Sequence, residues 1–268
     1  MRPVQDLCKI TLGVAVITLG TLTYHSSAYA GSLGPKAIDL REWTQQGILE
    51  KGNWVVSDDG TSVVQDIHEG SGTFFVSPDK FINTIIRGKF KVDTKQDDDW
   101  MGLMFGLESP TGDNIEATGE SSFFLFDWKQ ADQGSHKEGL SLAKVSGKYG
   151  AYANRSRFDV LRSDFGQDKG WQDLTEYEFA LLYEEEGIKI DIDGQTIFEI
   201  DAEELGRNFD PGHVALYTAS QKDVKFSDLS YESTAASTSV PEPSSAIGLL
   251  GIGAAGVGSL LKGKKRSQ

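Results

Sequence analysis

Cysteine is almost absent from this chain of 268 residues. The single cysteine, Cys8, lies near the N-terminus, so a disulfide within the chain is excluded. A zinc site is not indicated either, because the four histidines lack the spacing of a zinc motif. The sequence also has no serine–histidine–aspartate pattern, phosphate-binding glycine loop or haem-attachment motif. We therefore expect a domain that folds without crosslinks.

Basic residues are few compared with acidic ones. The chain has 26 lysines and arginines against 40 aspartates and glutamates, which gives a net charge of −14. Residues 1–30 carry a net charge of +1 and residues 240–268 one of +3, and removing both leaves −18 on the central part. Such a domain repels phosphates, so nucleic acid is excluded as an electrostatic partner. The balance suits a protein that binds divalent cations, although a solvated acidic surface has the same composition.

The N-terminal segment has the layout of a secretory signal peptide. Arg2 and Lys9 precede the apolar run 10–22, and an Ala-Tyr-Ala pattern ends at Ala30. The alternative is a membrane anchor, but about 13 apolar residues are too few to span a bilayer. We therefore expect a signal peptide over residues 1–30 with cleavage after Ala30.

The C-terminal segment has three parts in a fixed order after the polar linker 233–239. They are the box Pro241-Glu242-Pro243, the glycine-rich apolar run 246–261 and the basic cluster 262–266. This order resembles the PEP-CTERM sorting signal of Gram-negative bacteria, which is read by an exosortase. The resemblance implies export to the cell surface, with segment 240–268 forming a short transmembrane helix in an anchored intermediate and touching the membrane nowhere else. A plain C-terminal anchor is the alternative.

The centre of the chain contains two short segments that are apolar on both alternating faces. They are 97–108, which opens with three aspartates, and 123–130, and both read as strands covered on two sides. Turn-forming residues between them, over 109–114, predict a hairpin with a long loop.

Three motifs in this part of the chain carry a resemblance to a known family. Residues 97–106 read Asp-Asp-Asp, aromatic, x-Gly-x-x-Phe-Gly, and the next strand ends in Trp-Lys-Gln at Gln130. With the blocks 170–177 and 226–232, this order resembles the C-terminal domain of thrombospondins. The resemblance implies a calcium-binding, concanavalin A-like sandwich over residues 31–232, which is an all-β, two-sheet antiparallel jelly roll. The thrombospondin domain contains cysteine, and here this chain departs from it.

The acidic run Asp97, Asp98 and Asp99 is the predicted metal site. Three consecutive carboxylates beside a buried strand repel one another, so we expect a cation there, and calcium prefers several oxygen ligands. Strand alternation would place Asp98 on the opposite face from the other two, so one shared ion requires a bulge or a loop. The alternative is a solvated entrance to the strand.

A weaker ligand-binding prediction covers Asp127, Trp128 and Lys129. An ionised aspartate in so apolar a strand needs a partner, which could be a metal, Lys129 or a ligand hydroxyl. The rings of Trp100, Trp128 and Trp171 could stack on sugars, although most tryptophans in sandwiches belong to the core. A structural role for Asp127 is the alternative.

Two further acidic patterns lie late in the chain. Asp191 and Asp193 precede Gly194 and read as turn residues. Glu199, Asp201 and Glu203 alternate as on one face of a strand, which resembles the Glu-x-Asp-x-Glu core of laminarinase-like glycosidases, where the outer pair is catalytic. We could assign no conformation to the polar region 149–168.

The leading interpretation is a secreted, non-catalytic, calcium-binding adhesion or matrix module. It would associate with the cell surface or with extracellular polysaccharide, and bind a glycan or a surface protein. The alternatives are a glycoside hydrolase that uses Glu199 and Glu203, and a purely structural coat protein.

Overall fold

A computed structural model describes residues 34–47, 52–68, 70–108, 122–146, 155 and 158–234. All of them lie in the second of two compact units, Gly31–Gln268. The elements are β1 (Lys36–Ala37), η1 (Leu40–Glu42), β2 (Thr44–Gly47), β3 (Trp54–Val56), β4 (Ser62–Gln65), β5 (Gly72–Phe81), β6 (Thr84–Val92), β7 (Trp100–Leu107), β8 (Ser122–Lys129), β9 (Gly139–Ser146), β10 (Phe158–Phe165), β11 (Glu176–Tyr183), β12 (Gly187–Ile192), β13 (Gln195–Asp201), α1 (Ala202–Leu205), β14 (Gly212–Ala219) and β15 (Val224–Ser233).

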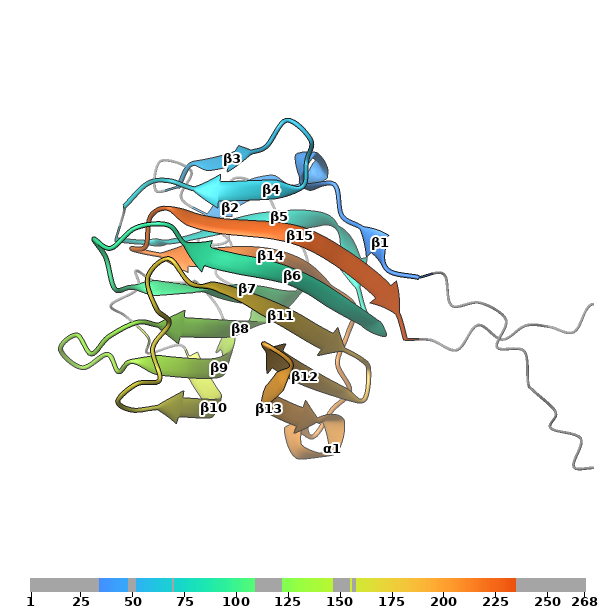
Figure 1. Cartoon of the computed structure of the whole chain (residues 1–268). Helices are drawn as coiled ribbons and strands as arrows, with labels where there is room; N and C mark the ends of the chain where they lie inside the picture. The colour runs from blue at the N-terminus through green and yellow to red at the C-terminus, as the bar shows by residue number, and fades with distance from the viewer. Residues whose placement is uncertain are drawn as a thin grey trace, which may run out of the picture. The chain divides into compact units, whose positions relative to one another are not determined.

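The strands form two antiparallel sheets, which lie one behind the other in Figure 1. Sheet A has the order β13-β12-β11-β6-β15-β4-β3, with β1 also paired to β15, and sheet B has the order β10-β9-β8-β7-β14-β5-β2. At the centre of each sheet the neighbours come from distant parts of the chain, as with β6 beside β15 and β7 beside β14, which is typical of a jelly roll. This confirms the predicted all-β, two-sheet antiparallel fold.

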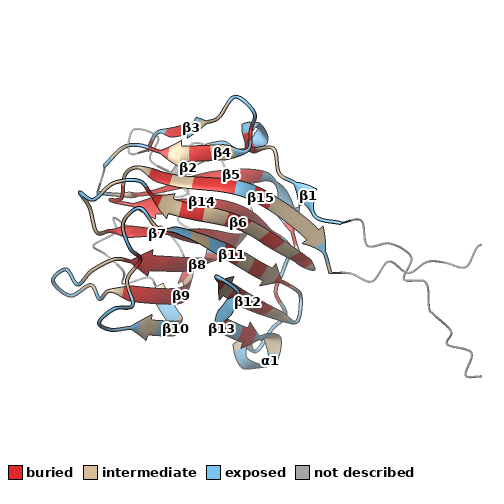
Figure 2. Cartoon of the chain, in the orientation of Figure 1, coloured by how far each residue is buried: buried red, intermediate tan, exposed pale blue. Residues whose placement is uncertain are grey.

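Side chains from the inner faces of both sheets meet in one apolar core. Along β6 every second residue is buried, which Figure 2 shows as alternating colours on that strand. Phe90 of sheet A packs edge-on against Trp128 of sheet B with ring centroids 6.1 Å apart, and Phe126 packs against Phe198 in the same way. The sheets are therefore joined by aromatic contacts across the core.

The two central strands, β7 and β8, are neighbours in sheet B, as predicted. Their alternate residues belong to two different buried clusters: Phe124 and Phe126 to the core, Phe123 and Leu125 to a second apolar cluster on the outer face. A strand buried on both sides has no polar face, which explains the continuous apolar runs in the sequence.

Glycine is required at two positions of the β7 motif. A Cβ atom on Gly102 would lie 2.0 Å from the carbonyl oxygen of Phe126 on the neighbouring strand. Gly106 has a φ of +74°, in the left-handed region. The spacing of these glycines therefore reflects close strand contact and a local twist.

One region without a predicted conformation contains a strand, and one predicted turn region lies outside the described residues. Region 149–168, which we left unassigned, contains the edge strand β10. Its pairing with β9 shifts register between Val160 and Arg162, and none of its residues is buried, so no clean alternation marks it. The turn-rich segment 109–114 lies outside the described residues. In the described ranges, no helix is long and apolar enough to cross a membrane.

Candidate functional site

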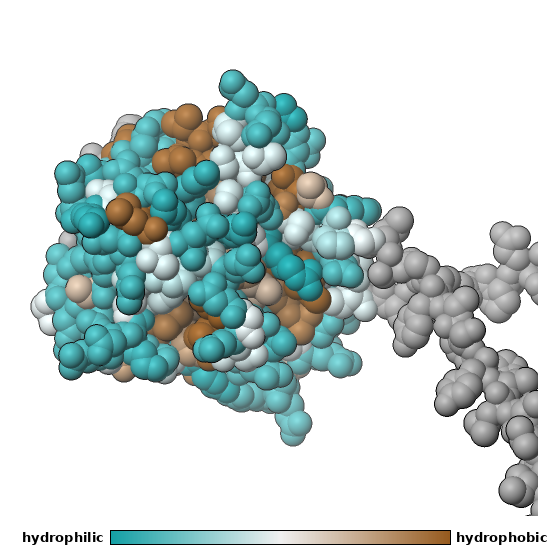
Figure 3. Space-filling model, in the orientation of Figure 1, coloured by the Kyte–Doolittle hydropathy of each residue, from teal (hydrophilic) through white to brown (hydrophobic). Residues whose placement is uncertain are grey.

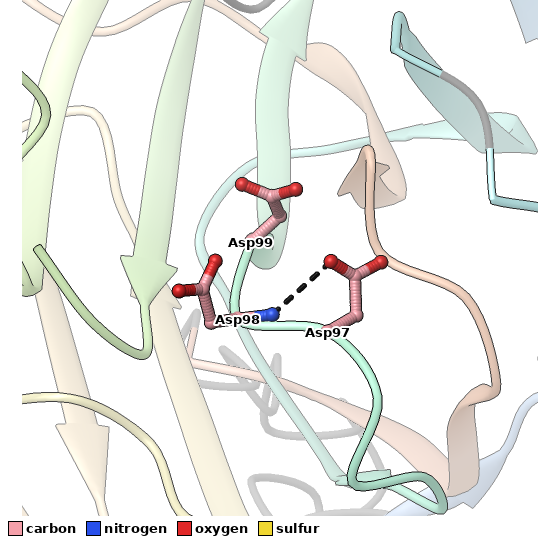
Figure 4. A group of neighbouring side chains, drawn as sticks. All are labelled: Asp97, Asp98 and Asp99. Carbon is pink, nitrogen blue, oxygen red and sulfur yellow. Dashed lines mark hydrogen bonds between the residues drawn. The ribbon is translucent and has the colours of Figure 1, made fainter. Parts of the chain in front are cut away.

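The acidic run lies in the loop that connects β6 to β7, directly before the first residue of β7. Because Asp97, Asp98 and Asp99 precede the strand, its alternation does not separate their side chains. Each offers a carboxylate oxygen, and the three oxygens lie within 4.8 Å of one another (Figure 4). The loop thus provides the convergence that one shared ion requires.

Asp97 is held by its own loop and by a histidine. One carboxylate oxygen accepts a hydrogen bond of 3.1 Å from the backbone N–H of Asp98, which Figure 4 marks with a dashed line, and the other contacts Nδ1 of His68. The side chain is only 9% exposed. Burial raises the pKa of Asp97, although the hydrogen bond from His68 acts in the opposite direction. The ionised form of Asp97 is therefore incompletely compensated.

A buried lysine provides part of the positive charge that the sequence led us to expect. Nζ of Lys129 lies 3.1 Å from a carboxylate oxygen of Asp99 and 3.3 Å from one of Asp98, and it donates to the backbone carbonyl of Asp98 at 2.8 Å. It also lies 4.5 Å from the ring centroid of Trp100. The antiparallel register pairs Trp100 with Lys129, which places the lysine beside the residue that precedes Trp100.

Two more residues anchor the acidic loop, and neither was predicted to contact it. The backbone N–H of Asp99 donates to the side-chain oxygen of Gln221 at 3.0 Å, and its carbonyl accepts from the indole N–H of Trp171 at 3.0 Å. Trp171 belongs to the 170–177 motif, so two of the recurring motifs meet at this loop. Because the two motifs occur together in the sequence, the contact between Trp171 and Asp99 could have been anticipated. No local sequence pattern marked Gln221.

The residues of the loop fit a hard cation in the chemistry of their donors. Three carboxylates against one ammonium leave two negative charges when His68 is neutral, which matches a divalent ion. All the donors are oxygens, as calcium prefers. Asp98 is 38% exposed at its side chain, so the cluster is open to solvent on one side.

Asp127 has a different partner from those we considered. Nη1 of Arg155 lies 2.7 Å from its carboxylate, and the hydroxyl of Ser141 donates to the other carboxylate oxygen. The side chain of Asp127 is 4% exposed and that of Arg155 is 23% exposed, so the carboxylate is buried and the guanidinium only partly. Arg155 lies in the polar region to which we could assign no conformation, and no periodic pattern marked it. The contacts therefore support the structural alternative for Asp127.

The tryptophans that could have stacked on sugars are packed within the protein. Trp128 points to the inner face, away from Asp127 and Lys129, where it donates to the carbonyl of Lys169 at 2.7 Å and packs on Tyr177. Trp100 and Trp171 are 3% and 1% exposed. Asp127, Trp128 and Lys129 consequently do not form one surface.

The proposed catalytic carboxylates do not share a strand face, so that prediction was wrong. Strand β13 ends at Asp201, whose carboxylate accepts a hydrogen bond of 2.7 Å from the N–H of Glu204 and caps helix α1. Glu203 lies in this helix, while Glu199 lies in the strand. Good helix formers follow the cap and Gly206 ends the helix with a φ of 74°, so local capping overrides the alternation.

Known proteins with similar sequences include thrombospondins. Thrombospondin-2 of Gallus gallus is 27% identical over 209 residues, and thrombospondin-1 of Xenopus laevis is 27% identical over 202 residues. Each match covers 67% of this chain but only 16% of the thrombospondin. Among solved structures, a Bacillus subtilis protein of unknown function with a galectin-like fold has a TM-score of 0.50 at 13% identity, and the match covers 72% of this chain and 90% of that one. That likeness concerns the fold.

Two family models match separate parts of the chain. The model of the thrombospondin C-terminal region matches residues 49–150, which include the acidic loop and strands β7 and β8. The model of the PEP-CTERM protein-sorting motif matches residues 239–264, which include Pro241, Glu242 and Pro243. Both predicted resemblances are thereby confirmed: the chain combines a region similar to the thrombospondin C-terminal region with a PEP-CTERM sorting motif.

Proposed function

We propose that this protein is a calcium-stabilised, lectin-like module that is sorted to the cell surface and binds extracellular polysaccharide or a surface protein there. The sorting motif indicates export and surface sorting, and the sandwich is of the galectin-like type. The proposal includes a signal peptide over residues 1–30, cleavage after Ala30, and processing of segment 240–268 by an exosortase. These parts lie outside the described residues.

The observation that carries the calcium part of the proposal is the convergence of Asp97, Asp98 and Asp99. Lys129 neutralises part of the negative charge on the buried side of this cluster. The negative charge of Asp97, on the other side of the cluster, is incompletely compensated. A bound calcium ion would supply the missing positive charge, and these three aspartates would hold it. It would also fix the loop before β7 in a domain without cysteine, since the chain's single cysteine is Cys8.

We propose a binding role without catalysis. The carboxylates of the hydrolase alternative, those of Glu199 and Glu203, lie on different elements. The sequence pattern therefore no longer supports the close pair of carboxylates that a retaining glycosidase needs. A coat protein without a glycan ligand is the second candidate, because the tryptophan rings that could have stacked on sugars are packed inside the protein.

A glycan array separates these functions. The full-length protein, labelled and applied in millimolar calcium, should bind a subset of bacterial and plant polysaccharides, and binding should weaken in excess chelator. The same protein should release no reducing ends from those polysaccharides over a day. Binding to no glycan would contradict the lectin-like role in favour of the coat protein, and reducing ends that disappear in a Glu199→Gln variant would restore the hydrolase.

A further inference from the structure

The outer face of sheet A carries a groove that no predicted site residue explains. It has a volume of about 470 Å³ and extends over strands β6, β11 and β12. Figure 3 shows this face, with hydrophobic patches between hydrophilic side chains over the lower strands. This volume is within the range of pockets that hold small ligands.

The groove results from one small residue in a row of long ones. The register places Arg87 opposite Ala180, and Ala180 opposite Asp191, so the three lie side by side on adjacent strands. The methyl group of Ala180 leaves the space between the two charged side chains unfilled. In a neighbouring row, Leu182 adds apolar surface to the lining of the groove.

The charges that line the groove balance. Arg87, Lys89 and Lys189 face Glu178, Asp191 and Asp228, which is unusual in a chain with a net charge of −14. Lys89 lies 3.1 Å from Asp228, and Lys189 lies 3.5 Å from Asp191. A groove with this lining offers both donors and acceptors, and two further carboxylates lie beside it, Glu232 at 3.2 Å from Arg87 and Glu176 at 3.7 Å from Lys89.

Asp191 itself points to a ligand that donates hydrogen bonds. We predicted a turn residue, but it lies within strand β12, and its Oδ1 atom is buried. Among the described residues, none donates a hydrogen bond to this oxygen. Because Oδ1 is closed to solvent, a ligand in the groove would donate to the other carboxylate oxygen, Oδ2, which lies 3.5 Å from Nζ of Lys189.

We propose that this groove binds a neutral saccharide, with Asp191 accepting from one hydroxyl, Arg87 donating to another, and the Ala180–Leu182 surface contacting the C–H face of a sugar ring. This inference rests on the proposed glycan-binding function and gives that function a location. Sugar hydroxyls both donate and accept, which suits paired cations and carboxylates.

The test uses the full-length protein and a panel of neutral trisaccharides: laminaritriose, cellotriose, maltotriose, mannotriose and chitotriose. Affinities are measured by isothermal titration calorimetry for the wild type and two variants. Ala180→Phe fills the groove from the outer face, and Asp191→Ala removes the acceptor. The matched control is Ala37→Phe, which adds the same ring to an exposed residue of strand β1.

We expect Ala180→Phe to lower the affinity for the bound trisaccharide at least about tenfold and Asp191→Ala several-fold, with Ala37→Phe unchanged. Circular dichroism and the melting temperature check that each variant is folded. If the wild type binds and both groove variants bind equally well, the groove is not the site, while the glycan-binding function stands. If the wild type binds no saccharide on the panel or on the array, both proposals fall.

Discussion

The ammonium nitrogen of Lys129 lies 3.1 Å from a carboxylate oxygen of Asp99, and the two side chains are 1% and 4% exposed. The same ammonium donates to the backbone carbonyl of Asp98 at 2.8 Å. One lysine of β8 thus fastens the loop that precedes β7. Because both charges are buried, each depends on the other for compensation.

Replacing Lys129 with methionine should destabilise the domain by about 3–5 kcal/mol, because Asp99 would be left buried and unpaired. For a domain of this size, that loss lowers the melting temperature by roughly 6 to 20 °C. The matched control is Lys137→Met, because Lys137 pairs with Asp132 at an exposed site and should change little. The double variant Lys129→Met, Asp99→Asn should recover part of the loss. Equal melting curves for the wild type and Lys129→Met would contradict this account.

Calcium should raise the melting temperature of the full-length protein. An ion that binds only the native state contributes roughly 2.7 kcal/mol at a hundredfold excess over its Kd. This energy corresponds to about 5–10 °C here, and magnesium should do less because it gives up its water reluctantly. Differential scanning fluorimetry in millimolar calcium, in millimolar magnesium and in excess chelator measures the shift.

The variant Asp97→Asn separates the ion from the lysine. Asp98 and Asp99 remain to pair with Lys129, so the variant should fold yet lose most of the calcium shift, as should the triple change of Asp97, Asp98 and Asp99 to asparagine. Neutralising the exposed acidic turn 184–186 with three glutamines should leave the shift intact. A calcium shift that survives Asp97→Asn would place the ion elsewhere.

Asp97 should also make the free energy of unfolding depend on pH. This free energy should fall as the pH rises above 3.8, the ordinary pKa of an aspartate carboxyl. Burial raises the pKa of Asp97, so the native state holds this proton more tightly than the unfolded chain does. In the window just above pH 3.8 the native state therefore binds more protons, and the free energy of unfolding decreases with pH there. Urea unfolding between pH 3.5 and 6 in chelator, compared with Asp97→Asn, isolates this contribution. A difference between the two proteins that does not vary with pH would show that the pKa of Asp97 is unshifted.

The substitution Gly102→Ala should disrupt the centre of sheet B. The added methyl group would meet the carbonyl oxygen of Phe126 at 2.0 Å, so β7 and β8 would have to separate. We expect a loss of several kcal/mol or insoluble protein. Gly134→Ala is the control: its φ is +61° but no atom lies within 4 Å of the added group, so it should cost about 1 kcal/mol. Similar solubility and melting temperatures for both variants would contradict the close contact.

The sequence by itself determined the class of fold, the central strands and the position of the acidic run beside one of them. Alternation over a few residues is a local property, so β7 and β8 could be recognised from their apolar runs and glycines. The charge of three adjacent aspartates was equally local. It led us to expect a cation, and Lys129 lies beside Asp99, while calcium remains a proposal.

Only the tertiary structure decided which groups meet. Lys129 pairs with Asp99 and not with Asp127, because the antiparallel register places it opposite Trp100. Arg155 reaches Asp127 from a segment without periodicity, and Asp191 lines a groove only because Ala180 lies on the neighbouring strand. Such contacts depend on strand pairing between distant parts of the chain, and no short pattern in the sequence encodes that register.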